Sequence, residues 1–392
     1  MPPDGRLIVT LKVWDYVEEY ERDRDQILAA VDRVFRSGRL ILGPHVCQFE
    51  ERFAAYCGVR HGIGVDNGTN ALMLALRALG VTPGSEVITV PNTAVPTVSA
   101  IVAAGGTPRF VDIDRESYLM DVGQLEDAIT DRTACILPVH LFGQCVPMTE
   151  VRRIASARRI PVIEDCSQSH GATIGGRKAG SMSDAAAFSL YPTKTLGAYG
   201  DGGIVLTDRD DVNARVRRLR FYGMEGFGSG DPGVREAKLA YSAVENGYNS
   251  RLDEVQAAIL LVKLARLDED IARRRAIAAR YDEQLRDTSL VLPRTLPGNT
   301  HVYYLYVCRY PDRDRILSEM AARDVLLNVS YPHPIHLMPA YHELGYRQGN
   351  FPEAERAARE IFSLPMYPTL SEAQQETVCR ALGEVLAETV NV

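Results

Sequence analysis

One lysine of this chain stands where a side chain could act as a nucleophile. Lys194 lies between the apolar run 185–188 and a glycine-rich turn, and a second apolar run follows at 204–206. Burial of an ammonium group favours the neutral amine, which can attack a carbonyl. An enzyme that uses a lysine in this way usually holds pyridoxal phosphate (PLP) on it. Taken alone, the pattern also fits a surface lysine beside a turn.

A carboxylate is expected at the end of a buried strand. Residues 161–163 are apolar, and Asp165 follows them closely. A buried carboxylate needs a cation or several hydrogen-bond donors. The ring nitrogen of PLP is such a cation, and keeping it protonated makes the ring an electron sink. The alternative is that Asp165 caps a helix that begins near Ser167.

A third segment has the pattern of a phosphate-binding turn. Asn67, Gly68 and Thr69 lie between an apolar strand and a strongly helical run. Glycine allows close approach of an anion, the start of a helix favours a phosphate, and Thr69 adds a hydroxyl donor. The same pattern fits an ordinary strand–turn–helix. Together with Lys194 and Asp165, however, it supplies the three contacts that PLP requires.

These segments resemble the DegT/DnrJ/EryC1/StrS family of sugar aminotransferases, which have the type I aspartate-aminotransferase fold. Seven stretches in the same order carry the resemblance: residues 37–44, 49–58, 67–72, 165–171, 189–203, 247–258 and 364–368. It therefore runs over nearly the whole chain. It implies an α/β fold in which a mostly parallel sheet is sandwiched by helices, with a smaller C-terminal α+β domain.

The resemblance assigns roles around the ring of PLP. Lys194 would carry PLP as a Schiff base and move the proton between the substrate carbon and the cofactor, and Asp165 would pair with the ring nitrogen. Gln168 resembles the family residue that hydrogen-bonds the ring hydroxyl. His170 is open between a structural role and a catalytic one.

The resemblance also assigns residues to the phosphate of PLP. Gly68 and Thr69 would hold it with the hydroxyl of Ser189, unless that hydroxyl only bonds the backbone at a strand end. Asn249 resembles a family asparagine that reaches the phosphate of the neighbouring subunit's cofactor. That role implies a homodimer with shared active sites. The alternative is that Asn249 and Arg251 only cap the next helix.

The chain departs from the family pattern near the expected ring of PLP. Members usually have an aromatic residue that stacks on the ring, but residues 92–97 contain none. Either Val95 packs against the ring, or stacking is absent. Asn70 stands where aspartate is common, and Tyr304 stands where histidine is frequent. Each departure could alter substrate preference.

The resemblance implies transamination in two halves. L-glutamate would give its amine to PLP, and a nucleotide-linked 3-keto or 4-keto deoxysugar would then receive it. Some family members are dehydratases with histidine in place of the lysine, and Lys194 argues against that activity. The form of residues 191–203 resembles members that act at C3. The alternatives are an aminotransferase of a cyclitol ketone and a non-catalytic binding or accessory protein.

Two segments offer contacts for the second substrate. The diphosphate of a nucleotide sugar needs cationic or N–H donors. Candidates in or near a glycine-rich segment at 224–246, which we expect to be a mobile loop, are Arg220, Arg235 and Lys238. Residues where the family has a substrate-proximal loop are Tyr331, Pro332 and His336. The alternative for this second segment is a plain turn.

The elements that must position these residues follow from apolar runs. The runs that predict strands are 62–65, 87–90, 109–112, 135–139 and 161–163, and helical patterns intervene at 97–104 and 149–158. Continuous apolar strands alternating with helices indicate a mostly parallel sheet covered on both faces. Ligands bind such sheets beyond the carboxyl ends of the strands, where Asp165 and the 67–69 turn fall.

The length of 392 residues favours two domains. We expect a large PLP-binding domain at 1–255, with an N-terminal helix at 25–36 that ends at Gly38. Residues 256–392 would form a linking helix and the small domain. The elements expected there are a long helix over 252–285, a strand at 301–307, and helices near 313–323, 352–362 and 371–388.

The composition indicates what kind of protein this chain is. The chain is 46% hydrophobic and 24% charged, as in a soluble globular protein, and its net charge of −7 argues against nucleic-acid or anionic-membrane binding. Its seven cysteines are dispersed without a Cys-x-x-Cys pair, which favours buried thiols in a reducing cytoplasm, with no disulfide framework and no metal site. We see no signal peptide or membrane span.

Overall fold

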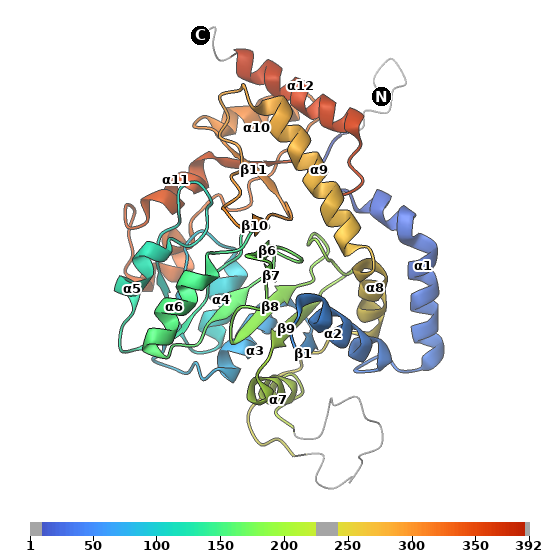
Figure 1. Ribbon diagram of the computed structural model, residues 1–392, viewed down its shortest axis with the longest axis vertical. Helices are drawn as coiled ribbons and strands as arrows, with labels where there is room; N and C mark the ends of the chain where they lie inside the picture. The colour runs from blue at the N-terminus through green and yellow to red at the C-terminus, as the bar shows by residue number, and fades with distance from the viewer. Residues whose placement is uncertain (1–9, 225–241, 389–392) are drawn as a thin grey trace.

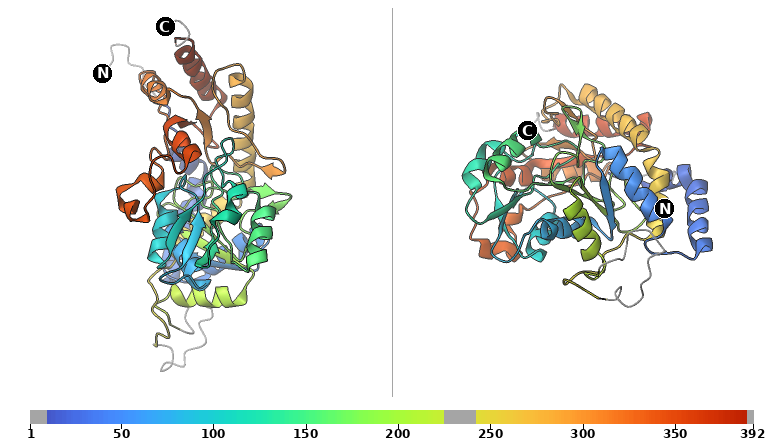
Figure 2. Two further views of the ribbon diagram at one scale, coloured as in Figure 1. Left: turned by 90° about the vertical axis from the view of Figure 1, so that its left-hand side faces the viewer. Right: turned by 60° about the horizontal axis from the view of Figure 1, so that its bottom comes forward.

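The structure is a computed structural model that describes residues 10–224 and 242–388 (Figure 1). The strands of the central sheet lie between α4 (Val95–Ala103) and α6 (Met148–Arg158) on one side and α2 (Pro44–Cys57) and α8 (Glu254–Leu264) on the other. Turned by 90°, the molecule shows α12 (Glu372–Glu388) at one end and α7 (Asp210–Leu219) at the other (Figure 2). The sheet thus lies nearer to α7 than to α12 (Figure 1).

The central sheet combines two ladders. One has the order β1 (His61–Val65), β9 (Gly203–Thr207), β8 (Ala185–Ser189), β5 (Ile163–Asp165), and the other has the order β3 (Thr107–Phe110), β2 (Glu86–Thr89), β4 (Thr133–Ile136). Parallel bridges from Ile136 to Val162 and from Val139 to Asp165 join β4 to β5. The predicted order of strands and helices, and the mostly parallel sheet, are confirmed.

One strand of this sheet runs against its neighbours. β9 pairs antiparallel with both β1 and β8. The link between β8 and β9 contains no helix, so the chain turns back at once instead of crossing over the sheet. The reversal creates the turn that carries Lys194. It also places β9 beside the start of α3 (Gly68–Ala78), which packs against β8 and β9.

The N-terminal helix is longer than the apolar pattern predicts. α1 spans Tyr16–Ser37, because Asp15 caps it by accepting a hydrogen bond from the N–H of Val17. Its first turns are polar and held by ion pairs, such as that of Arg22 with Asp270, at 2.7 Å. Gly38 ends the helix in the left-handed region, with φ of 66°, as predicted.

The long helix expected over 252–285 is two helices. α8 ends at Leu264 and α9 spans Leu267–Leu285. No proline or glycine marks the break, so periodicity alone could not locate it. The change of direction lets α8 pack on α1 and α2 while α9 packs on α12.

The C-terminal part differs from the prediction at two element boundaries. The strand expected at 301–307 is β11 (Tyr306–Arg309), which pairs antiparallel with β12 (Ile361–Leu364). Residues before it bond the segment near Phe142 instead, and Tyr303 has a left-handed φ of 48° that interrupts a strand. The helix expected at 352–362 is α11 (Pro352–Glu360), because β12 begins directly after it.

The remaining elements are short or close to their predicted places. They are η1 (Val122–Gln124), α5 (Leu125–Ala128), β6 (Thr173–Ile174), β7 (Arg177–Lys178), β10 (Asn299–Thr300), α10 (Arg313–Ala321), η2 (Ile335–Leu337) and η3 (Pro339–Leu344). β10, β6 and β7 form a small separate sheet.

Two large apolar cores and a small cluster of Ala30, Val34 and Ala258 lie beneath the described elements. The larger one surrounds the central sheet, and the second is built mainly from α9, β11, β12 and α12, with Leu11 from the N-terminal segment. The domain division at residues 255 and 256 stays a prediction. Within residues 10–224 and 242–388, no helix is both long enough and apolar enough to cross a bilayer.

Candidate active site

Six of the seven predicted cofactor residues line one cavity. The cavity measures about 240 Å³ and lies where β5 and β8 end and α3 begins. The predicted residues on its wall are Gly68, Thr69, Asp165, Gln168, Ser189 and Lys194. A larger hollow of about 490 Å³ lies beside Pro161 and Asp208, and no predicted site residue lines it. The smaller cavity is therefore the candidate active site.

Asp165 ends β5 and is almost completely buried. Its Oδ2 accepts a hydrogen bond from the Thr97 hydroxyl at 2.8 Å, and its Oδ1 accepts one from the Ser167 N–H at 3.1 Å. The Ser167 contact closes a turn and not a helix, so the capping alternative is wrong. Within the described residues, the hydrogen bonds to the Asp165 carboxylate come from neutral donors, and a buried carboxylate held in this way can receive a cationic ring nitrogen.

Thr97 was missed as a site residue because it lies inside a predicted helix. It belongs to the first turn of α4, which follows β2. The Thr97 hydroxyl donates its proton to Asp165, so it accepts in turn from the Thr93 hydroxyl, at 2.9 Å. The available signal was its place beyond the carboxyl end of a parallel strand.

The phosphate end of the cavity depends on a glycine. A Cβ on Gly68 would lie 2.5 Å from the Cβ of Ser189, so only glycine permits this approach of α3 to the end of β8. Asn67 caps α3 by accepting a hydrogen bond from the N–H of Asn70, at 2.8 Å. The Ser189 hydroxyl accepts from the Tyr191 N–H at 3.3 Å, which leaves its proton available to a ligand.

Asn70 has a structural reason to replace aspartate. Its amide donates to the Asp66 carboxylate at 2.8 Å, and Asp66 also accepts from the Ser250 hydroxyl. An aspartate at position 70 would place two carboxylates against each other. The substitution therefore matches the neighbourhood of Asp66.

Lys194 lies half-buried in the turn between β8 and β9. Its backbone N–H donates to the Tyr191 carbonyl at 2.9 Å, which fixes the turn. Its Nζ lies 4.8 Å from the ring centroid of Tyr304, and the Tyr304 hydroxyl lies 3.2 Å from the Thr193 hydroxyl. Tyr304, which stands where the family frequently has histidine, thus lies directly beside Lys194, the proposed nucleophile.

Gln168 joins the cavity to the loop that contains Tyr331. Its Oε1 accepts from the Phe142 N–H at 2.8 Å, and its Nε2 donates to the Tyr331 hydroxyl at 2.5 Å. The rings of Phe142 and Tyr331 stack at 6.1 Å. One amide hydrogen of Gln168 remains for a ligand. Burial raises the pKa of Tyr331, so its hydroxyl stays protonated.

The two predicted histidines lie outside the cavity wall. His170 is buried against Phe188, with ring centroids 5.1 Å apart, and burial together with the charge of Lys194 lowers its pKa to about 3. A neutral, enclosed imidazole supports the structural alternative. His336 is buried against Glu355, with its Nε2 3.1 Å from a carboxylate oxygen, and burial lowers its pKa.

Asn249 does not line the same cavity within one chain. It faces a second hollow of about 430 Å³ together with Arg251, and Asp201 lines both hollows. The N-cap of α8 is Asp253, so the alternative that Asn249 caps this helix is wrong. The guanidinium of Arg251 instead lies over the ring of Phe221, at 5.2 Å. The proposed reach of Asn249 into a neighbouring subunit stays a prediction.

Two further expectations need correction. Val95 is 42% exposed and does not line the cavity, whereas Ala94 and Pro96 do, so Val95 does not provide the missing stacking. Arg220 is fully buried, with its Nη1 2.5 Å from Glu50, and is unavailable to a diphosphate. Arg235 and Lys238, with most of the segment 224–246, lie outside the described residues.

The family model of the DegT/DnrJ/EryC1/StrS aminotransferases matches residues 21–383. The chain belongs to this family. A dTDP-3-amino-3,4,6-trideoxy-alpha-D-glucose transaminase of Micromonospora megalomicea subsp. nigra is 51% identical over 383 residues, covering 96% of this chain and 99% of that protein. The predicted type I fold and the predicted sugar aminotransferase activity are confirmed.

Solved structures of the family are similar in fold. S. venezuelae DesV, in complex with a ketimine intermediate, has a TM-score of 0.90 at 40% identity, covering 96% of this chain and 98% of that one. NtdA of Bacillus subtilis, with bound cofactor PMP, has a TM-score of 0.84 at 29% identity, covering 93% and 82%. PMP is the aminated form of PLP, so family members of this fold hold that cofactor.

Proposed function

We propose that this chain is a PLP-dependent aminotransferase that moves an amine from L-glutamate to the C3 keto group of a dTDP-linked deoxyhexose. The observation that carries the proposal is the convergence of Gly68, Asp165, Ser189 and Lys194, from distant parts of the chain, on one cavity. The form of residues 191–203 and the activity of the Micromonospora relative both support C3.

The residues of the cavity fit PLP in three places. The N-terminus of α3 at Gly68 and Thr69, with the Ser189 hydroxyl, offers neutral donors to a phosphate. Asp165 offers a buried carboxylate to the ring nitrogen. Lys194 offers an amine, which lies 4.8 Å from the ring centroid of Tyr304. Together these are the donor, acceptor and nucleophile that the cofactor needs.

When bound, PLP would supply an aldehyde to receive the amine and a ring to withdraw electrons from the substrate carbon. The chain supplies orientation and proton transfer. Asp165, held by Thr97 and Ser167, would keep the positive charge at the ring nitrogen. Lys194 Nζ would take the proton from the α-carbon of glutamate and pass it to the cofactor carbon that carried the aldehyde. In the second half it would return a proton from that carbon to the sugar carbon that receives the amine.

The first test is spectroscopic. Purified protein with PLP should show a visible absorption band that L-glutamate removes and that a dTDP-linked 3-keto deoxyhexose restores. Borohydride reduction followed by peptide mapping should label Lys194, and Lys194→Ala should abolish the label. Restoration by a cyclitol ketone alone would favour the cyclitol alternative. Absence of any band would favour the non-catalytic alternative.

We further propose a homodimer in which Asn249 completes the phosphate site of the partner. Asn249 faces a hollow adjoining its own cavity, with Asp201 between them, so a second copy could seat its phosphate end there. Mixed dimers of Lys194→Ala with Asn249→Ala chains distinguish the two arrangements. Sharing across the interface leaves one intact site and restores activity, whereas sites within single chains leave none.

A further inference from the structure

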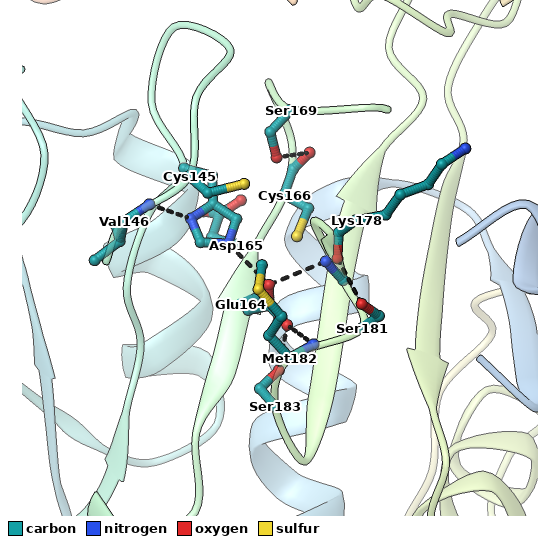
Figure 3. Close-up of polar contacts among 12 residues, drawn as sticks. Cys145, Val146, Glu164, Asp165, Cys166, Ser169, Lys178, Ser181, Met182 and Ser183 are labelled. Atoms are coloured by element: carbon teal, nitrogen blue, oxygen red, sulfur yellow. Dashed lines mark hydrogen bonds and ion pairs between the residues drawn. The ribbon is translucent and has the colours of Figure 1, made fainter. Parts of the chain in front are cut away.

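A buried cluster lies behind the active site, around the end of β5, the strand that carries Asp165 (Figure 3). His140, Glu164 and Cys166 each offer one atom that could bind a metal ion, and these three atoms lie within 4.8 Å of one another. All three residues are buried. Such a group resembles a metal site. Its hydrogen bonds, however, already use the atoms that a cation would need.

The imidazole of His140 is engaged at both nitrogens. The Val146 N–H donates to Nδ1 at 3.1 Å, so Nδ1 carries no proton. In the neutral ring Nε2 is then protonated, and it donates to a carboxylate oxygen of Glu164 at 2.9 Å. One backbone donor thus selects the tautomer that points at Glu164.

The carboxylate of Glu164 is also fully occupied. It accepts from the Gly180 N–H at 3.0 Å, the Met182 N–H at 2.8 Å and the Ser183 hydroxyl at 2.8 Å (Figure 3). Burial acts to raise the pKa of Glu164, but the bond from His140 and these donors hold it below its usual range. Burial raises the pKa of the Cys166 thiol, which therefore remains a neutral, weak ligand.

These contacts join three segments at the cavity. Successive residues of a strand point to opposite faces, so Glu164 faces the 178–183 turn while Asp165 faces the cavity. The backbone N–H of His140 donates to the backbone carbonyl of Asp165 at 3.0 Å, and the backbone N–H of Asp165 donates to the carbonyl of Pro138 at 3.0 Å. The segment that carries His140 also provides the Leu141 wall of the cavity.

The same segment contacts Gln168. The Phe142 N–H, two residues beyond His140, donates to Gln168 at 2.8 Å. Any shift of the segment would move this donor, the Leu141 wall and the backbone partner of Asp165 together. The hydrogen-bonded pair of His140 and Glu164 thus lies directly behind the two side chains assigned to the ring of PLP.

We propose that His140 and Glu164 are positioning residues that hold the 138–142 segment against the end of β5 and so set the place of Asp165 and Gln168 at the cofactor. This inference rests on the proposed function. The decisive variant is Glu164→Gln, which keeps the shape but places an amide N–H₂ among donors. The variant therefore loses the hydrogen-bond acceptor of either the His140 ring or the N–H groups of the 178–183 turn.

Glu164→Gln should weaken PLP binding about tenfold, as expected from the loss of one hydrogen bond to a charged group. It should also shift the pH at which the cofactor band titrates, because Asp165 and Gln168 face the ring. A purely structural role would lower the stability of the apoprotein and leave both quantities unchanged. Nitrogen NMR of His140 should show the Nε2-protonated tautomer in the unmodified protein.

The matched control is Glu355→Gln, which disrupts the other buried histidine–glutamate pair, away from the cavity. It should leave PLP affinity and the titration unchanged. If Glu164→Gln does not fold, His140→Gln, which keeps a donor to Glu164, should show a smaller change in the same direction. Unchanged PLP affinity and titration in a folded variant, or a stoichiometric metal in the unmodified protein, overturns the proposal. Failure of the unmodified protein to bind PLP overturns the proposed function instead.

Discussion

Replacing Gly68 by alanine tests the phosphate cradle most directly. The added Cβ would lie 2.5 Å from the Ser189 Cβ and 2.8 Å from its Cα, well inside normal contact distance. Overpacking of this kind costs about 1–3 kcal/mol. The strain is relieved only if α3 and the end of β8 move apart, which separates the helix N-terminus from the Ser189 hydroxyl. We expect the dissociation constant of PLP to rise about 10- to 100-fold.

The assay is titration of apoprotein with PLP, followed by absorbance, for Gly68→Ala and for a control glycine. Gly383 lies inside α12, and a Cβ there meets nothing within 4 Å. Gly383→Ala should leave PLP binding unchanged and slightly raise the free energy of unfolding. Inorganic phosphate should raise the unfolding temperature of unmodified apoprotein but not of Gly68→Ala. A folded Gly68→Ala protein with normal affinity for both PLP and phosphate would refute the reasoning.

Three further substitutions test other parts of the structure. Thr97→Val removes the hydroxyl that donates to Asp165, and we expect it to weaken PLP binding by about 1–3 kcal/mol in the same titration; equal affinity would exclude that role. The unfolded chain protonates His170 near pH 6.5, but the folded chain does so only near 3. The free energy of unfolding should therefore fall as pH drops through this window, and His170→Leu should reduce that slope in denaturant titrations. Arg220→Met leaves the buried carboxylate of Glu50 with fewer partners and should lower the free energy of unfolding by about 3–5 kcal/mol. Its KM for the sugar nucleotide should not change, since Arg220 is enclosed; a large rise in KM would restore the diphosphate hypothesis.

Much of the candidate site could be predicted from the sequence because its parts are local patterns. A glycine at the start of a helix, an aspartate after a short apolar run and a lysine in a glycine-rich turn each have a meaning within a few residues. Gly38 at the end of α1 was predicted for the same reason, since a left-handed backbone favours glycine there. The order of strands and helices then indicated that Gly68 and Asp165 would meet at one edge of the sheet.

The tertiary structure decided which side chains support those residues. The hydroxyl of Thr97 reaches Asp165, and the ring of Tyr304 lies beside Lys194, only because segments far apart in the chain are packed together. The prediction that Arg220 binds a diphosphate failed for the same reason. The charge of Arg220 suits a phosphate, but the fold buries it against Glu50. Local sequence determines the conformation of each segment, but burial and partners depend on neighbours that only the packed chain supplies.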